Sequence, residues 1–295
     1  MNTRLLIVHA LSPLHAGTGQ SLGAVDLAIA RDRATELPYL PGSSIKGSLR
    51  EVSRTFERGA QDGPRTVALF GPETENASDH AGGALFGDAN LLLLPVRSVA
   101  GTFAWATSPY LLHRFARDLQ DLGRTDLPPA VRINEVGGCI VAPRTSLKVG
   151  NCVIFEDLDL VPEQDNVAQQ WVNLLNPLIF PGDQATWQVS LEQRFCIVHD
   201  DLMAFLARHG TAVVARVALK PDTKTVQNLW HEESLPPETI LHSLVHLDPP
   251  KAVQRSAADL LTDLAALTRH SVQLGGKATV GRGRCRLVLS AGKEA

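Results

Sequence analysis

The order of apolar runs along this chain restricts the folds that it can adopt. Short runs with the pattern of β-strands and longer runs with helical spacing follow one another without strict alternation. Regular strand–helix alternation would predict a parallel sheet covered on both faces, whereas this mixed order favours an α+β domain with an antiparallel sheet. No segment of the 295 residues has the composition of an interdomain linker. We therefore predict a single domain over residues 1–295.

Strands are predicted where residues are densely apolar or alternate in polarity. These segments are residues 4–10, 26–31, 83–98, 152–162, 187–198, 211–219, 239–247 and 282–290. Helices are predicted where apolar residues recur every three or four positions. These segments are residues 43–59, 108–123, 167–179, 200–210 and 253–267. Segments without periodicity are predicted to be insertions into the domain, at residues 57–83, 124–151 and 220–238.

Cysteine spacing and hydropathy restrict the compartment and the kinds of site. The four cysteines, at positions 139, 152, 196 and 285, form no CxxC pair. Their scatter argues against a zinc site or a redox motif and indicates a reducing compartment. The N-terminal apolar run is too short for a signal peptide, and the run at residues 91–96 is too short to span a bilayer. We expect a cytoplasmic protein without membrane contact.

The charge balance restricts how the chain could bind nucleic acid. It has 28 Lys and Arg against 31 Asp and Glu, a formal charge of -3. A protein that binds nucleic acid alone usually carries a basic excess. RNA binding by this chain would therefore need a local basic patch or the help of neighbouring subunits.

A glycine-rich segment, HAGTGQSLGAVD, is bracketed by His15 and Asp26. Its glycines, Gly17, Gly19 and Gly23, would let the backbone approach a ligand closely. Histidine and aspartate are both used for proton transfer or metal binding in RNA cleavage. An aspartate that opens a strand is more often a turn or capping residue, so these residues alone leave both interpretations open.

The segment PGSSIKGSLR places polar and basic side chains at the start of a predicted helix. It is not a P-loop, because the GxxxxGK[ST] spacing is absent. Exposed amides and the side chains of Ser43, Ser44, Lys46 and Arg50 could hold a phosphate. A capped surface helix with solvated charges explains the same residues.

The segment LGGKATVGRGRCRL is the most basic stretch of the chain. Glycines at 275, 276, 281 and 283 are interleaved with Lys277, Arg282, Arg284 and Arg286. Backbone amides and cations in this arrangement could hold a phosphodiester chain without reading its bases, with Gly276 among the contacts. The simpler alternative is a tight turn before a C-terminal strand.

A fourth segment, LKPDTKTVQNLWHEESLPPET, combines basic, aromatic and acidic residues. Lys220, Lys224, Thr225 and Trp230 could form an extended finger that stacks on bases or wedges between them. Glu232 or Glu233 could complete an acidic site. A solvated hairpin is the alternative.

The four segments occur together and in order, and in that combination the chain resembles the RAMP superfamily of CRISPR proteins. Within it, the chain is most similar to the repeated backbone subunit of type III-B (Cmr) effector complexes. The similarity runs from about residue 4 to the C-terminus, and its most specific blocks are PVRSVAGTFAWATSPYLL and WHEESLPPET.

The resemblance implies a ferredoxin-like (RRM-like) palm with inserted finger and thumb-like β-hairpin segments. It implies that copies stack in a helical filament on guide crRNA, with other type III effector subunits, and cleave paired single-stranded target RNA. The metal-dependent ribonuclease residue falls on Asp26, which would hold Mg²⁺ or another divalent metal. By the same resemblance the loop histidine is His15, the helix lysine is Lys46, and the acid is Glu232 or Glu233.

The resemblance also yields a set of expected RNA contacts. They are Lys46, Ser43, Ser44, Arg50, Gly17, Gly19, Lys224, Trp230, Gly276, Lys277, Arg282 and Arg284. Three other functions remain open: a guide-binding scaffold without catalysis, the type III-A backbone subunit, and a stand-alone endoribonuclease that processes guide precursors.

Overall fold

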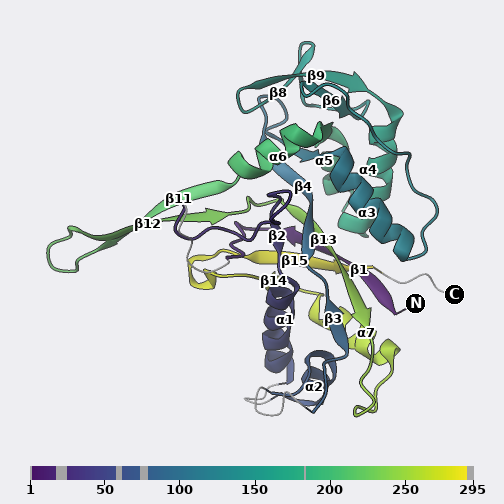
Figure 1. The fold of residues 1–295 in the computed structure, drawn as a ribbon, viewed down its shortest axis with the longest axis vertical. Helices are drawn as coiled ribbons and strands as arrows, with labels where there is room; N and C mark the ends of the chain where they lie inside the picture. The colour runs from purple at the N-terminus through teal and green to yellow at the C-terminus, as the bar shows by residue number, and fades with distance from the viewer. Residues whose placement is uncertain (1, 18–24, 58–61, 74–78, 183, 291–295) are drawn as a thin grey trace.

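The structure is a computed structural model that describes residues 2–17, 25–57, 62–73, 79–182 and 184–290. One large sheet runs through the molecule (Figure 1). Its central part consists of β1 (Thr3–Ala10), β13 (Ile240–Leu247), β15 (Arg284–Leu289), β14 (Val272–Gln273) and β4 (Ala89–Arg97). β1 pairs antiparallel with both β13 and β15. Helices cover both faces of β1, so the strand is buried on both sides. Burial on both sides explains the continuous apolar run in its sequence.

The first face of the central sheet is covered by α1 (Gly42–Glu57), α2 (Pro64–Phe70) and α7 (Ala257–Leu267). Leu6 and Val8 of β1 pack there against Leu49 of α1 and Leu264 of α7. Two short strands, β2 (Tyr39–Leu40) and β3 (Ala84–Phe86), extend the sheet beside β4 and β13. α7 begins later than predicted because a capping box at Ser256 fixes its first turn.

The second face is covered by α3 (Pro109–Asp121), α4 (Asn166–Ile179) and α5 (Ala185–Arg194). Leu5 and Ile7 of β1 belong to this core, together with Phe115 of α3 and Trp171 of α4. Alternate residues of one strand therefore enter two different cores, as the two-residue period of a strand requires.

Beyond β4 the sheet continues into a second region at the end of the molecule farthest from α1 and α2 (Figure 1). Its strands are β5 (Phe103–Thr107), β10 (Phe195–Val198), β6 (Gly138–Val141), β9 (Leu158–Gln164), β8 (Cys152–Phe155) and β7 (Lys148–Val149). α6 (Asp200–His209) packs on it, with Met203 and Leu206 in the core. Two of the pairings, β5–β10 and β6–β9, are parallel, so the sheet is mixed. The α+β class predicted from the sequence is confirmed.

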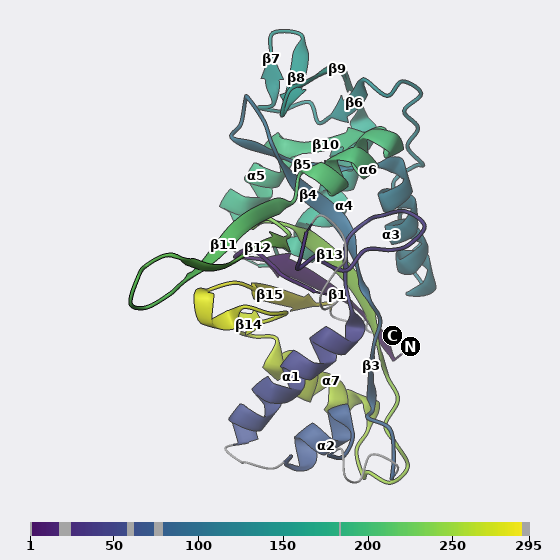
Figure 2. The ribbon, with the colours of Figure 1, turned by 60° about the vertical axis from the view of Figure 1, so that its left-hand side comes forward.

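A two-stranded hairpin projects from the body of the molecule (Figures 1 and 2). It is formed by β11 (Ala212–Leu219) and β12 (Val226–Ser234). Periodicity predicted residues 220–238 to be irregular, but all of β12 lies within them, in a hairpin such as the resemblance implied. The pattern gave no strand because VQNLWHEES mixes polar and apolar residues on both faces, as suits a strand that stands largely in solvent.

Three further predictions of local structure were wrong. Residues 187–198 form α5 and then β10, since only Leu191 of the alternating apolar residues is buried while Trp187 and Val189 stay exposed. Residues 152–162 turn back at Glu156, whose φ of 51° starts β9 beside β8. Residues 124–151 contain β6 and β7, which are too short to show periodicity.

The strand predicted at residues 26–31 forms single bridges instead of a ladder. Leu27 bridges Glu232, Ile29 bridges Gly17, and Arg31 bridges Pro38. Because each bridge has a different partner, no continuous strand develops. In the described part of the chain, no helix has both the length and the apolar character needed to cross a bilayer.

Candidate functional site

Asp26 lies in a turn at the base of the projecting hairpin. Its Oδ2 accepts a hydrogen bond from the main-chain N–H of His231 (2.8 Å), and the His231 Nδ1 lies 3.7 Å from the same oxygen. Main-chain bonds of Leu27 to His231 and Glu233 hold the turn against β12. The carboxylate is 57% exposed, and its Oδ1 has no partner among the described residues. Asp26 is therefore both fixed and open to solvent.

Glu232, the next residue of β12, is buried and carries three contacts. Its carboxylate pairs with Lys277 (2.8 Å), accepts from the Trp230 indole (2.8 Å), and lies 3.4 Å from Arg216. Burial acts to raise the pKa of Glu232, but the hydrogen bonds from Lys277 and Trp230 outweigh it and lower the pKa to about 2. At neutral pH Glu232 is a fixed anion that joins the hairpin to the glycine-rich C-terminal turn.

Glu233 points to the opposite face of β12, as strand alternation requires. It pairs with Arg31 (2.5 Å) and accepts hydrogen bonds from Thr211 (2.8 Å) and the Ile29 main chain (3.1 Å). Both acids of the WHEE segment are thus engaged in ion pairs, one on each side of the strand.

His15 is buried behind Asp26's loop and is also tied to β12. Its Nδ1 donates to the main-chain oxygen of Glu233 (2.7 Å), because a carbonyl can only accept. A Cβ on Gly17 would lie 2.7 Å from His15 Nε2, so only glycine fits at position 17 without a shift of the ring. On the main chain, the Gly276 N–H donates to the His15 oxygen (2.9 Å). The structure therefore brings His15, Gly17 and Gly276 together.

The basic C-terminal turn follows β14 and includes a short 3-10 helix, η2 (Ala278–Val280). Lys277 points to Glu232, and Arg282 is buried with its Nη1 donating to Ser234 (2.7 Å). Arg284, by contrast, exposes its side chain. Gly283 has a φ of 77° and lies so close to the Leu274 oxygen that no Cβ could fit. Two of the cations predicted to hold RNA are thus turned inward.

The residues predicted at the start of α1 form a separate group. The Gly42 N–H that opens the helix donates to Asp88 (2.8 Å), from the loop between β3 and β4. Ser43 is exposed, and Ser44 and Lys46 are partly exposed. Arg50 bonds Asp62 and the main-chain oxygens of Gly71 and Pro72. Its charge stabilises the polypeptide that follows α1.

The tip of the hairpin is a turn that starts at Lys220, with Lys224 at a φ of 55°. Trp230 is not at the tip: it pairs with Arg216 near the base. The hairpin exposes aliphatic side chains in place of an aromatic one. They are Val213, Val214, Val217, Leu219, Val226 and Leu229.

The described residues contain no cluster of three or more His, Cys, Asp or Glu side chains that could hold a metal ion. Asp26 alone offers an exposed carboxylate oxygen, while Glu232 and Glu233 are engaged elsewhere. Mg²⁺ is commonly bound through one or two carboxylates together with substrate phosphates and water, so this donor set fits such an ion only with a nucleic acid present.

The site contains contacts that the sequence did not reveal. His231 was missed because it acts on Asp26 through its main chain, which no residue type signals. The anchoring of the α1 N-terminus by Asp88 was also missed, although GDAN carries a turn signal. Gly19 and Gly23 lie outside the described residues.

Comparison with known proteins gives consistent results. The model of the RAMP superfamily matches residues 7–286. The CRISPR system Cmr endoribonuclease Cmr4 of Pyrococcus furiosus is 33% identical over 298 residues, which cover 98% of this chain and 96% of the relative. The CRISPR system Cms endoribonuclease Csm3 of Enterococcus italicus is 34% identical over 80 residues, 24% of this chain and 37% of that protein.

Solved structures show the same fold. Oligomeric Cmr4 from Pyrococcus furiosus superposes with a TM-score of 0.77 at 28% identity, covering 98% of both chains. A chain of the type III-B Cmr-beta complex bound to cognate target RNA has a TM-score of 0.73 at 19% identity, covering 97% of this chain and 96% of that chain.

Proposed function

The chain belongs to the RAMP superfamily, and we propose that it is the repeated backbone subunit of a type III-B CRISPR effector complex. In this role copies of the chain bind guide RNA side by side with other effector subunits. The complex then cleaves target RNA paired to the guide. The observation that carries the proposal is the match to a named Cmr endoribonuclease over 98% of this chain.

The type III-A and scaffold alternatives have less support. The similarity to the Cms endoribonuclease covers 24% of this chain, against nearly the whole chain for the Cmr enzyme. A scaffold would not need an exposed carboxylate held by a main-chain N–H, in a turn whose main chain is bonded to β12, and Asp26 has both features. A catalytic backbone subunit accounts for both observations.

Asp26 is the proposed catalytic residue. RNA carries its own nucleophile, the 2′-hydroxyl, so the protein must deprotonate and orient that group. With Oδ2 held by His231, the exposed Oδ1 can act either as the base that accepts the proton or as the ligand of a divalent cation. His15, hydrogen-bonded through Nδ1, presents Nε2 towards Gly17 at the same loop. Glu232 acts as a positioning anion, since a pKa of about 2 leaves it unsuited to proton transfer near neutral pH.

A divalent cation such as Mg²⁺ is proposed to bind at Asp26 together with phosphate oxygens of the RNA. When bound, it would supply charge stabilisation at the phosphate that is cleaved. The proposal predicts that chelation abolishes cleavage without releasing RNA from the complex.

RNA contacts are proposed along three parts of the molecule. At α1 they are Ser43, Ser44 and Lys46; Arg50 supports them through the chain segment that it binds. At the loops they are Gly17, Gly276 and the exposed Arg284, with Lys277 and Arg282 holding the turn in shape. Lys224 and the aliphatic side chains of the hairpin are proposed to enter between bases, and Trp230 to support the hairpin base.

The test compares the assembled complex carrying Asp26→Ala with one carrying Asp157→Ala, an exposed acid of the β8–β9 turn. We expect Asp26→Ala to assemble and hold guide and target RNA but to lose target cleavage, while Asp157→Ala cleaves normally. Normal cleavage by Asp26→Ala would support the scaffold function instead. Cleavage of precursor RNA by the purified chain without metal would support the stand-alone nuclease.

A cytoplasmic location is part of the proposal. The four cysteines are all free thiols, and three of them are buried. Buried thiols without disulfides suit a reducing compartment, which is where guide RNA would be bound.

A further inference from the structure

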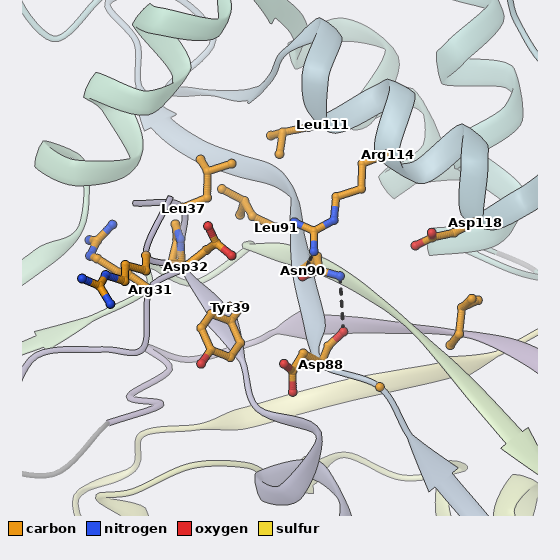
Figure 3. Close-up of a pocket in the computed structure, with 14 residues that line it drawn as sticks. Arg31, Asp32, Leu37, Tyr39, Asp88, Asn90, Leu91, Leu111, Arg114 and Asp118 are labelled. Carbon is orange, nitrogen blue, oxygen red and sulfur yellow. Dashed lines mark hydrogen bonds between the residues drawn. The ribbon is translucent and has the colours of Figure 1, made fainter. Parts of the chain in front are cut away.

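A cavity of about 550 Å³ lies on the opposite side of Arg31 from the candidate site. It is enclosed by residues 31–39, the start of β4 and one side of α3 (Figure 3). Figure 2 shows the segment before β2 arching towards α3. Neither Asp26 nor His15 lines the cavity, so the proposed cleavage chemistry leaves it without a role.

Three arginines and three aspartates line the cavity, but they are engaged to different degrees. Each aspartate has a local partner: Asp32 accepts from the Thr35 and Ala34 main chain, Asp88 from the Gly42 N–H, and Asp118 pairs with His242. Each of these carboxylates therefore has a hydrogen-bond donor that offsets the cost of burying its charge.

The arginines are less well compensated. Arg31 pairs with Glu233, but Arg33 and Arg114 have no carboxylate within salt-bridge distance among the described residues. Arg114 donates to the Asn90 side chain (2.7 Å) at the centre of the cavity wall (Figure 3). The cavity thus presents two guanidinium groups that can accept an anionic partner.

The leucine floor of the cavity consists of Leu37, Leu91, Leu111 and Leu244, of which the first three are almost fully buried. The leucine side chains would gain nothing from contact with a polyanionic backbone such as RNA, because the phosphates carry no apolar group. A peptide that places an apolar side chain between two acids matches both features.

β9 has this pattern on its solvent face. Asp159, Val161 and Glu163 alternate along one side of the strand and are all exposed, Val161 by 67%. Two further exposed acids, Glu156 and Asp165, flank the strand. The only ion pair found for these four acids in the described residues joins Glu156 to Arg97 at 3.8 Å, at the surface.

We propose that the solvent face of β9 docks into the arginine cavity of a second copy of this chain. The acids of Asp159 and Glu163 would pair with Arg33 and Arg114, with Val161 on the leucine floor. β9 lies in the end region (Figure 1), whereas the cavity is lined by the segment before β2, the start of β4 and α3, so the two surfaces are different. Contacts between unlike surfaces generate rings or open helical stacks, in keeping with an oligomeric relative. The inference rests on the proposed function, in which copies assemble side by side.

The test uses charge reversal in the full chain with guide RNA, followed by sedimentation velocity at two salt concentrations. Arg33→Glu with Arg114→Glu, or Asp159→Lys with Glu163→Lys, should weaken self-association at least tenfold. Combining all four changes should restore it, because the pairs are re-formed with opposite sign. The control, Lys251→Glu with Arg269→Glu, makes the same net-charge change at exposed positions and should leave assembly intact.

The outcomes separate this contact from the proposed function. Unchanged assembly of both reversal pairs, or failure of the fourfold variant to recover, would overturn the contact while leaving the subunit role in place. Reduced guide-RNA affinity of the arginine variant with normal protein–protein association would make the cavity an RNA site. A wild-type chain that never oligomerises on guide RNA would overturn the proposed function itself.

Discussion

The main-chain N–H of His231 donates to Oδ2 of Asp26 at 2.8 Å, which joins the loop carboxylate to the second strand of the projecting hairpin. This N–H points away from β11, so it is not part of the hairpin ladder. The position of Asp26 therefore depends on β12 more than on the glycine-rich segment before it. A substitution that removes the main-chain N–H of His231 tests this dependence.

His231→Pro removes this N–H and should displace Asp26. Proline is tolerated where a strand N–H is outside the ladder, so the hairpin should persist. We expect target cleavage to fall on the order of tenfold, because misplacement of a catalytic group by about 1 Å has effects of this size or more. His231→Ala keeps the N–H and is the matched control. Equal rates for the two variants in single-turnover cleavage would contradict the positioning role.

Gly17→Ala should disturb His15. The new Cβ would lie 2.7 Å from Nε2, closer than real contacts, so the ring or the loop must shift. We expect lower cleavage with retained assembly, measured on the purified complex. Gly137→Ala provides the control, since a Cβ there meets nothing within 4 Å and its φ is not left-handed. A Gly17→Ala complex as active as the control would exclude His15 from the site.

Glu232 should make stability depend on acid pH. Its folded pKa of about 2 lies below its ordinary value of 4.5, so its stabilising effect is full above pH 4.5 and is lost as the pH falls towards 2. With allowance for the partly exposed Lys277, the effect is on the order of 2 kcal/mol. In urea unfolding, Glu232→Gln should lose this amount of unfolding free energy at pH 7, and its stability should fall less steeply than that of the wild type as the pH is lowered. Glu156→Gln, which changes an exposed acid, should show neither effect. A wild-type acid slope in Glu232→Gln would refute the assignment.

His242 should add a second dependence nearer neutrality. It is fully buried, which lowers its pKa below 6.5 despite the hydrogen bond to Asp118 (3.0 Å). The unfolded chain therefore takes up a proton that the folded chain resists, and stability falls as the pH drops below 6.5. His242→Gln should reduce the loss of Tm between pH 7.5 and 5, whereas His270→Gln at the surface should not. Identical pH profiles for His242→Gln and wild type would argue against this origin.

Much of the fold follows from the sequence because burial leaves a clear pattern. β1 and α3 were predicted within a few residues, since burial on both faces gives β1 a continuous apolar run and burial on one face gives α3 apolar residues at every third or fourth position. Apolar periodicity missed β12 because the strand stands largely in solvent and has no apolar face; the hairpin was indicated only by the resemblance and by the polar composition of the segment. α5 was misread because its exposed Trp187 and Val189 imitate strand alternation.

The candidate site was predicted in its residue types but not in its connections. His15 and Asp26 come close to Glu232 because both form hydrogen bonds to β12, the strand that contains Glu232. β12 lies about 200 residues after them in the chain. A motif indicates which side chains carry chemistry. It does not indicate that Lys277 and Arg282 turn inward, because that depends on which acceptors, Glu232 and Ser234, the fold places beside them.

Three consecutive residues of β12 hold the site: His231 binds Asp26, Glu232 binds Lys277, and Glu233 binds His15 through its main-chain oxygen. The base of the hairpin is thus fixed at the Asp26 carboxylate, and the length of its strands determines how far the tip reaches. Inserting two residues into each strand would move the tip outward by about 7 Å without moving the base. In the proposed function, the distance along the RNA between the base step that the hairpin enters and the phosphate that is cleaved would therefore depend on the length of this strand.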